Sequence, residues 1–275
     1  MMAAEARRAG ADRRFAACIF DLFGTLVPLS RRSDYYAALA VVPERLGLDA
    51  GAFREGWDAS YRERNEGRLA TLEDNVLEVC RRLGASSPPA AVTASLIPFR
   101  RLLDETLQPK PESAAVLDEI SRRRFALGLI SNCNPDVPAL FRRGALASRF
   151  HAALFSSEAG VAKPRPEIYV EMARLLGVAP GDCLYIGDGH GRELAGAAAV
   201  GMTTALLDHG QPDGYIFDRD ETGDFLLASL TDVLGIAGES TGTACPAARR
   251  QGGSAPAGGP TPPARCDGPP PLPDA

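Results

Sequence analysis

The chain has 275 residues, of which 45% are hydrophobic and 24% are charged, as expected of a soluble globular protein. Its formal net charge of −5 argues against broad binding to nucleic acids or anionic membranes, because those surfaces attract basic proteins. A small phosphorylated substrate stays possible, since it needs only one local cation.

The first residues, 1–14, are polar and rich in Arg, and they lack the apolar stretch of a signal peptide. We expect them to be flexible. No apolar run approaches the roughly 18 residues that a membrane-spanning helix requires. The six cysteines contain no C-x-x-C pair, which favours reduced thiols over a zinc site or a disulfide framework. These features predict a cytoplasmic protein.

The predicted core begins over residues 15–30. An apolar run, "RFAACIF", predicts a buried strand, and Asp21 follows it directly, ahead of a turn at Gly24-Thr25. An Asp after a strand is most often a turn or capping residue. The interpretation of Asp21 therefore depends on what the rest of the chain places beside it.

Residues 31–104 have helical spacing and no strand between the helical segments. The predicted helices lie within 33–48, 50–65, 71–84 and 89–106. Inserted helical segments often act as lids over a site at the edge of a sheet. We therefore expect a helical cap over 31–104.

After the insert, from 105 to 236, apolar strand-like runs alternate with helical patterns. The strand-like runs are 125–132, 151–157, 182–188 and 202–208. This alternation predicts an α/β fold: a Rossmann-like three-layer core with a parallel sheet, built from 15–30 and 105–236, and an inserted helical cap. The segment 237–275 is rich in Gly and Pro and is expected to be a disordered tail.

Polar residues stand at the predicted carboxyl ends of the strands, where ligands bind in open parallel sheets. They are Asp21, Ser131 with Asn132, Lys163 ahead of a helix, and Asp188 with Glu193 in the helix that follows. Asp21 can act as a covalent nucleophile. Asp21 and Asp188 would repel each other without a cation between them, and Mg²⁺ suits such an oxygen site. Ser131 can hold phosphoryl oxygens, and Lys163 can balance the charge that develops.

Four segments in this order, "FDLFGTLV", "LISN", "KPRPEIY" and "GDGHGRELAGAAAVGM", resemble the motifs of the haloacid dehalogenase-like (HAD) hydrolases over roughly residues 15–235. The resemblance implies that Asp21 is the nucleophile and that Ser131 and Lys163 assist it. It implies phosphate binding by Thr25, Ser131 and Asn132. It also implies a Mg²⁺ ion held by Asp21, the Phe23 carbonyl and Asp188, with Glu193 at the place of a further acidic ligand.

Two positions depart from the phosphatases of this family. Glu193 stands where they usually carry Asp, and its longer side chain could reach a metal directly or through water. The other is Phe23, where they also usually carry Asp. That Asp protonates the leaving group, and such help contributes typically about 10²–10⁴-fold. Three hypotheses follow. The first is a Mg²⁺-dependent phosphatase for a small phosphorylated metabolite, working through an aspartyl-phosphate. The second is a metal-independent 2-haloacid dehalogenase with an ester intermediate on Asp21. The third is a binding or regulatory protein with weak catalysis.

Asp188 favours the first hypothesis, because a second buried carboxylate without a cation would hinder attack by Asp21. A dehalogenase would also need an arginine from the cap for the substrate carboxylate, and Arg54 is the candidate by position. His190 could replace the missing acid as a proton donor, but the sequence favours a histidine of an exposed loop.

Overall fold

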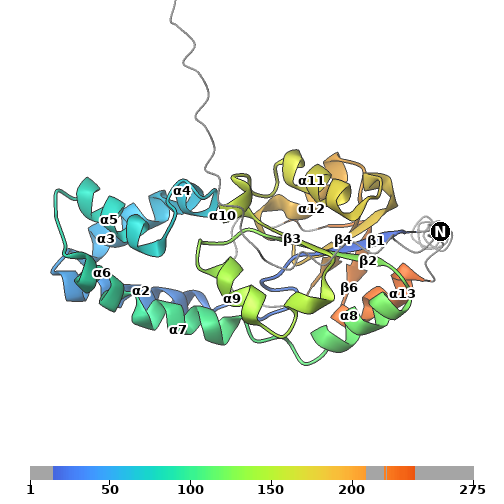
Figure 1. The fold of residues 1–275 in the computed structure, drawn as a ribbon, viewed down its shortest axis with the longest axis horizontal. Helices are drawn as coiled ribbons and strands as arrows, with labels where there is room; N and C mark the ends of the chain where they lie inside the picture. Colours follow the sequence, from blue (N-terminus) through green and yellow to red (C-terminus); the bar gives the residue numbers. More distant parts are fainter. Residues whose placement is uncertain (1–14, 209–219, 221, 239–275) are drawn as a thin grey trace, which may run out of the picture.

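The computed structural model describes residues 15–208, 220 and 222–238. The expected flexible segment 1–14 lies outside the described residues, and so does the expected tail 237–275 apart from its first two residues. Ala237 is the buried last residue of a helix, Val233–Ala237, so the predicted start of the tail was wrong there. Six parallel strands in the described part form one sheet, in the order β3-β2-β1-β4-β5-β6 (Figure 1). The strands are β1 (Ala17–Phe20), β2 (Ala126–Ser131), β3 (Ala152–Phe155), β4 (Cys183–Gly187), β5 (Thr203–Leu207) and β6 (Phe225–Leu227).

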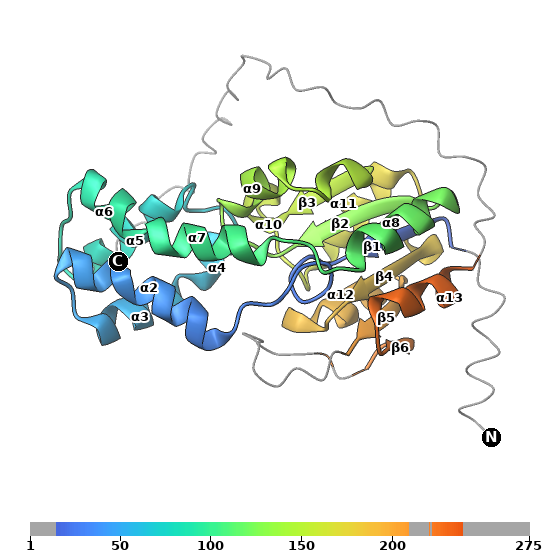
Figure 2. The ribbon, with the colours of Figure 1, turned by 90° about the horizontal axis from the view of Figure 1, so that it is seen from below.

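Helices cover both faces of this sheet. α11 and α12 lie on one face, and α8, α9 and α13 lie on the other (Figures 1 and 2). The core helices are α8 (Ser113–Arg122), α9 (Val137–Arg143), α10 (Ser156–Ala159), α11 (Pro166–Leu176), α12 (Glu193–Ala199) and α13 (Val233–Ala237), with short 3₁₀ turns η1 (Ala147–Arg149), η2 (Pro180–Asp182), η3 (His190–Arg192) and η4 (Leu230–Asp232). The α/β Rossmann-like fold class is thus as predicted.

The central strand β1 shows why the strands are apolar throughout. All four of its residues are buried. Ala17 and Ile19 belong to the hydrophobic cluster under α11 and α12, while Cys18 and Phe20 belong to the cluster on the opposite face. A parallel strand with helices on both sides buries successive side chains in two different cores, so it shows no polar alternation.

The register of β1 brings its carboxyl end level with two neighbours. Phe20 lies opposite Leu129 of β2 and Ile186 of β4. The residues that follow, Asp21 and the ends of β2 and β4, therefore meet at one edge of the sheet.

The helices between β1 and β2 pack together as a separate lobe at one end of the molecule, which we call the cap (Figures 1 and 2). They are α2 (Arg32–Leu46), α3 (Ala50–Ala59), α4 (Tyr61–Asn65), α5 (Leu72–Arg82), α6 (Pro89–Ser95) and α7 (Ile97–Thr106). Trp57 and Phe99 are fully buried in its centre, with ring centroids 5.8 Å apart. Aromatic burial of this kind holds the cap helices together.

Two of the helices predicted in the cap are each broken in two. The segment 50–65 divides into α3 and α4 at Ser60, and 89–106 divides into α6 and α7 at Leu96, two residues before Pro98. Pro98 occupies the first turn of α7, where its missing N–H costs least. Among the described helices, none combines the length and the apolar character needed to cross a membrane.

Candidate active site

The carboxyl ends of three adjacent strands meet at the candidate active site. Asp21 follows β1 directly, Ser131 is the last residue of β2, and Asp188 follows β4 directly. The Asp21 N–H donates to the Ile186 carbonyl at 2.9 Å, which continues the sheet hydrogen bonding one residue past the strand. Asp21, Ser131 and Asp188 are 6%, 0% and 4% exposed, respectively, so all three predicted residues are buried together.

Lys163 reaches this edge from the loop before α11. Its Nζ lies 2.5 Å from Asp21 Oδ1 and 2.5 Å from Glu193 Oε2, and it donates to Tyr185 Oη at 3.1 Å. Burial lowers the pKa of Lys163, but Asp21 and Glu193 outweigh that effect and raise the pKa above its ordinary value. The ammonium group therefore stays charged beside Asp21 at neutral pH.

The Asn132 side chain fixes the backbone of Lys163. Its Oδ1 accepts the Lys163 N–H at 2.8 Å, and its Nδ2 donates to the Lys163 carbonyl at 2.9 Å. Asn132 was predicted to bind phosphate. The structure gives its amide a positioning role toward Lys163, although the residue also lines the cavity described below.

Glu193, at the start of α12, holds Lys163 from the other side. Its Oε2 accepts hydrogen bonds from Lys163 and from the Tyr185 hydroxyl at 2.8 Å, and its Oε1 accepts the Gly189 N–H at 3.0 Å. Burial, followed by the charge of Asp21, raises the pKa of Glu193 to about 8. Both oxygens thus have protein donors. The predicted metal ligand Glu193 serves first as a partner of Lys163.

Glycines allow the acidic side chains to come close to the backbone. Gly24 has φ +81°, and a Cβ atom there would lie 2.0 Å from Asp188 Oδ2. At Gly187 a Cβ atom would lie 2.1 Å from Glu193 Oε1. A side chain at either position would displace a carboxylate of the site.

Three acids of the site could share a cation. Carboxylate oxygens of Asp21, Asp188 and Glu193 all lie within 4.8 Å of one another. Two ammonium groups oppose them. One is Lys163, and the other is Lys110, whose Nζ donates to the Gly24 carbonyl at 2.5 Å and whose charge also acts on Asp188 and Asp21. The all-oxygen donor set of the three acids suits Mg²⁺.

Two hydroxyl groups at this edge are buried without a hydrogen bond. Ser131 Oγ and Thr25 Oγ1 have no hydrogen-bond partner within the described residues, and both residues are 0% exposed. A buried hydroxyl that lacks a partner is costly unless a ligand supplies one. Both residues were predicted to bind phosphate, and their orphaned hydroxyls fit that role.

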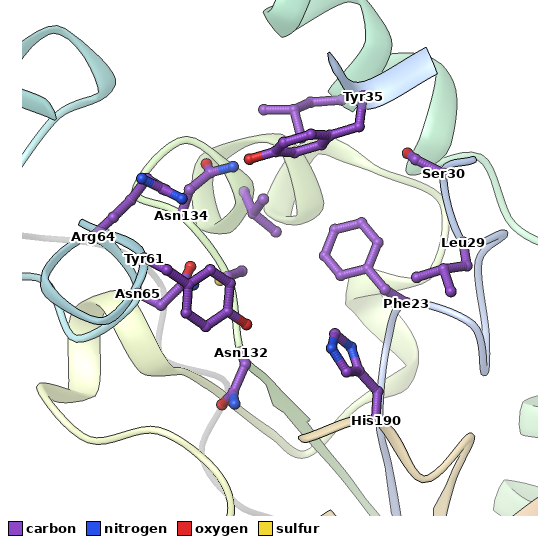
Figure 3. A pocket seen from close by; sticks show the side chains of 13 residues that line it. Phe23, Leu29, Ser30, Tyr35, Tyr61, Arg64, Asn65, Asn132, Asn134 and His190 are labelled. Carbon is purple, nitrogen blue, oxygen red and sulfur yellow. The ribbon is translucent and has the colours of Figure 1, made fainter. Parts of the chain in front are cut away.

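A cavity of about 120 Å³ opens between the cap and this edge of the sheet (Figure 3). Its lining residues come from the segment after β1, from the cap, from the segment after β2, and from η3: Phe23, Leu29, Ser30, Tyr35, Tyr61, Arg64, Asn65, Leu103, Asn132, Cys133, Asn134, Val137 and His190. Figure 3 shows the Phe23 ring facing this space. The phosphatases whose motifs this chain resembles would present an acid at that position.

His190 also lines the cavity, so it is not the exposed loop residue that the sequence favoured. Burial lowers the pKa of His190 to about 4, partly opposed by Asp21. The imidazole is therefore neutral at pH 7 and is a poor replacement for a general acid.

The arginine that the cap contributes to the cavity is Arg64, not Arg54. Arg54 stacks on the Tyr36 ring at 3.9 Å, and 51% of its side chain is exposed. Arg64 is only 2% exposed and lines the cavity. Sequence reasoning missed Arg64, Lys110 and Tyr185, because nothing in their local sequence separates them from a solvated charge or a core aromatic.

Residues 15–201 match the haloacid dehalogenase-like hydrolase family. The chain belongs to this family. It is a hydrolase by that membership, and the resemblance seen in the four sequence motifs is confirmed.

Two of the relatives found by sequence are named as phosphatases. A glyceraldehyde 3-phosphate phosphatase of Methanopyrus kandleri is 28% identical over 232 residues, covering 81% of this chain and 97% of the relative. A phosphoserine phosphatase of Thermus thermophilus is 33% identical over 126 residues, covering 45% of this chain and 49% of the relative.

Among solved structures, a 2-haloacid dehalogenase from Pseudomonas syringae superimposes with a TM-score of 0.59 at 24% identity, covering 81% of this chain and 97% of the other. A HAD phosphatase from Thermococcus onnurineus gives a TM-score of 0.58 at 19% identity, covering 82% and 98%. These two structures share the fold with this chain.

Proposed function

We propose that the protein is a Mg²⁺-dependent phosphatase that hydrolyses a small phosphorylated metabolite through an aspartyl-phosphate on Asp21. The observation that carries this proposal is the buried cluster at the sheet edge, where Asp21 pairs with Lys163 beside a second acid, Asp188. The phosphatase names of the two sequence relatives support the same class of reaction.

The residues of the site fit a magnesium ion. The donors are hard oxygens, and carboxylate oxygens of three buried acids lie within 4.8 Å of one another. The bare Cα of Gly24 leaves room for Asp188 at the cluster. Asp21, Asp188 and the Phe23 carbonyl would hold the ion, with Glu193 acting through Lys163. When bound, Mg²⁺ supplies positive charge that offsets the phosphoryl oxygens.

The reaction uses groups already in place. A carboxylate oxygen of Asp21 attacks phosphorus, and the bond between phosphorus and the leaving oxygen breaks with its electron pair on that oxygen. Ser131 Oγ and Thr25 Oγ1 donate to the phosphoryl oxygens, and Lys163 balances their charge. Water then attacks the phosphorus of the aspartyl-phosphate, so that inorganic phosphate leaves and Asp21 is restored.

Phe23 restricts the leaving group. Its ring cannot donate a proton, and His190 is neutral at pH 7 because burial lowers its pKa to about 4. A poor leaving group such as an alkoxide would lose the roughly 10²–10⁴-fold that general acid catalysis supplies. We therefore propose substrates whose leaving group needs little protonation, such as acyl phosphates or anhydrides.

The alternative activity is hydrolysis of a 2-haloacid, with an ester on Asp21. Phe23 favours it, because halide leaves as an anion and needs no acid. Asp188 disfavours it, because a second buried carboxylate beside the nucleophile would oppose the approach of an anionic substrate. A binding or regulatory protein with weak catalysis is the third possibility, and the intact Asp21–Lys163 pair speaks against it.

Two substitutions test the proposal with p-nitrophenyl phosphate as the substrate. Asp21→Asn removes the nucleophile and is expected to abolish phosphate release. Asp188→Asn keeps the nucleophile and is expected to raise the Mg²⁺ concentration needed for half of the maximal rate. Full activity of the Asp21→Asn protein would overturn the mechanism.

A further inference from the structure

Arg64 is a buried cation at the cavity between the cap and the core. It lies on α4 and is 2% exposed. Its guanidinium carbon is 4.1 Å from the centre of the Trp57 ring, and its Nη1 donates to the Trp57 carbonyl and to Ser60 Oγ at 3.1 and 3.0 Å. These neutral groups hold the guanidinium in place but bring no full negative charge.

No carboxylate of the described residues lies within ion-pair distance of Arg64. The acids closest in sequence are committed to other arginines. Glu63 pairs with Arg82 at 2.6 Å, and Glu66 pairs with Arg62 and Arg68 at 2.8 and 3.3 Å. Within the part of the chain that the structure describes, Arg64 Nε and Nη2 also have no hydrogen-bond acceptor. A buried charge left in this state is costly unless a ligand brings the counter-ion.

The place of Arg64 separates it from the phosphoryl group. Figure 3 shows Arg64, Tyr61 and Asn65 of α4 on one side of the cavity, and Phe23, Leu29 and His190 on the other. Phe23 and His190 are each two residues from the acids of the site, Asp21 and Asp188. A phosphoryl group at Asp21 would therefore leave Arg64 to meet a different part of the substrate.

We propose that Arg64 binds a carboxylate of the substrate, which makes the substrate a small phosphorylated carboxylic acid. The two guanidinium nitrogens without acceptors, Nε and Nη2, match the planar, two-oxygen geometry of a carboxylate. The cavity of about 120 Å³ that Arg64 lines is large enough to hold a carboxylate. The inference rests on the proposed function, because that function sets where the phosphoryl group lies.

Phosphonoacetate and ethylphosphonate form a matched pair of probes that differ in the carboxylate. We expect calorimetry in the presence of Mg²⁺ to show about 10- to 100-fold tighter binding of phosphonoacetate by the wild-type protein. Arg64→Met should abolish this preference and leave the affinity for ethylphosphonate unchanged. Equal affinities in the wild type, or an unchanged preference in Arg64→Met, would overturn the proposal.

Arg54→Met is the matched control, since it makes the same change at the exposed arginine of the cap. It should keep the full preference. If Arg64→Met does not fold, Arg64→Lys serves in its place, because lysine keeps the charge and loses the fork of donors. The loss of one charged hydrogen bond should then weaken the preference for phosphonoacetate by about 3- to 10-fold. An unchanged preference in Arg64→Lys would contradict the proposal.

Phosphate release from p-nitrophenyl phosphate separates this inference from the proposed function. If phosphate release depends on Asp21 but the protein does not prefer phosphonoacetate, the role of Arg64 is excluded and the proposed phosphatase activity is retained. If the preference for phosphonoacetate depends on Arg64 but no phosphate is released, the proposed phosphatase activity is excluded and the carboxylate site at Arg64 is retained.

Discussion

At the scale of single residues, Phe23 sets the chemistry that the site can perform. Its ring faces the cavity two positions after Asp21, where it can neither give nor take a proton (Figure 3). Asp21 is paired with Lys163, whereas Ser131 Oγ and Thr25 Oγ1 have no hydrogen-bond partner within the described residues. Phe23 is thus the departure from the resembled phosphatase motif that bears most directly on the chemistry of the leaving group.

Replacing Phe23 with Asp should restore general acid catalysis. Because Phe23 is only partly buried, an Asp side chain fits there without an unpaired charge in the core. We expect Phe23→Asp to raise kcat/KM for alkyl phosphates by about 10²-fold, and for aryl phosphates much less. Phe23→Leu is the control, since it removes the ring without adding an acid. Equal gains on both substrates, or a gain in Phe23→Leu, would count against this account.

Gly24 is the residue whose missing side chain makes room for Asp188. An alanine Cβ would lie 2.0 Å from Asp188 Oδ2, so Gly24→Ala should displace that carboxylate. We expect Mg²⁺ affinity to fall about 10- to 100-fold. The measurement is the rise in melting temperature on adding Mg²⁺, which should shrink or vanish in this variant.

Gly177→Ala is the control for backbone strain. Gly177 has φ +69°, and a Cβ atom there would meet nothing within 4 Å. This variant should lose stability, about 1 kcal/mol, and keep the full response to Mg²⁺. An equal loss of the response in both variants would show that strain, rather than contact with Asp188, is responsible.

The sequence predicted those site residues that local pattern places at strand ends. Asp21, Ser131 and Asp188 each close an apolar run, and parallel register brings such ends together. Arg64 and Lys110 could not be found in this way, because each reaches the site from a helix or loop through tertiary packing alone. Glu193 was found, but its partners Lys163 and Tyr185 were needed to show what it holds.

At the scale of elements, Arg100 joins the cap to the core. It lies on α7 and donates to Glu73 of α5 at 2.7 and 2.8 Å, and to Asp136 at the start of α9 at 2.7 Å. Asp136 belongs to the core and Glu73 to the cap. The guanidinium therefore bridges the two lobes.

Arg100→Met should loosen this bridge and lower the free energy of unfolding by about 1 kcal/mol. Arg101→Met is the control, because Arg101 is 80% exposed and its ion pair within the described residues is with Glu105 on its own helix. Hydrogen bonds from Arg100 lower the pKa of Glu73. The contribution is thus fully present at neutral pH and is lost as the pH falls through that lowered pKa.

Urea unfolding at pH 7 and at about pH 3 measures both effects. The difference between Arg100→Met and the wild type should be larger at pH 7. A difference that stays constant with pH, or that equals the difference for Arg101→Met, would exclude the bridge as a source of stability.

The elements themselves were largely predictable, and the misses have physical reasons. The five longer strands lie where apolar runs predicted them. β6 was missed, because its three residues, Phe225–Leu227, are too few to show a pattern. The breaks at Ser60 and Leu96 were missed as well, because helical periodicity continues across both and only the packing of the cap sets the turn.

At the scale of the whole molecule, the core and the cap contribute different parts of the candidate site. The sheet edge of the core carries the proposed nucleophile Asp21, Lys163 and the other acids, while the cap contributes Arg64 and aromatic residues to the cavity. Such a division lets one reaction centre accept different substrates according to the cap above it. The central claim is that this centre transfers a phosphoryl group with the help of Mg²⁺, and that it does not displace halide.

The most direct test compares two reactions of the wild-type protein, with Asp21→Asn as the blank for both. One is phosphate release from p-nitrophenyl phosphate with Mg²⁺ or with EDTA, and the other is chloride release from 2-chloropropionate in EDTA. We predict phosphate release that requires Mg²⁺ and Asp21, and no chloride release. Chloride release in EDTA without phosphate release would contradict the account and make Phe23, rather than Asp188, the residue that decides the reaction.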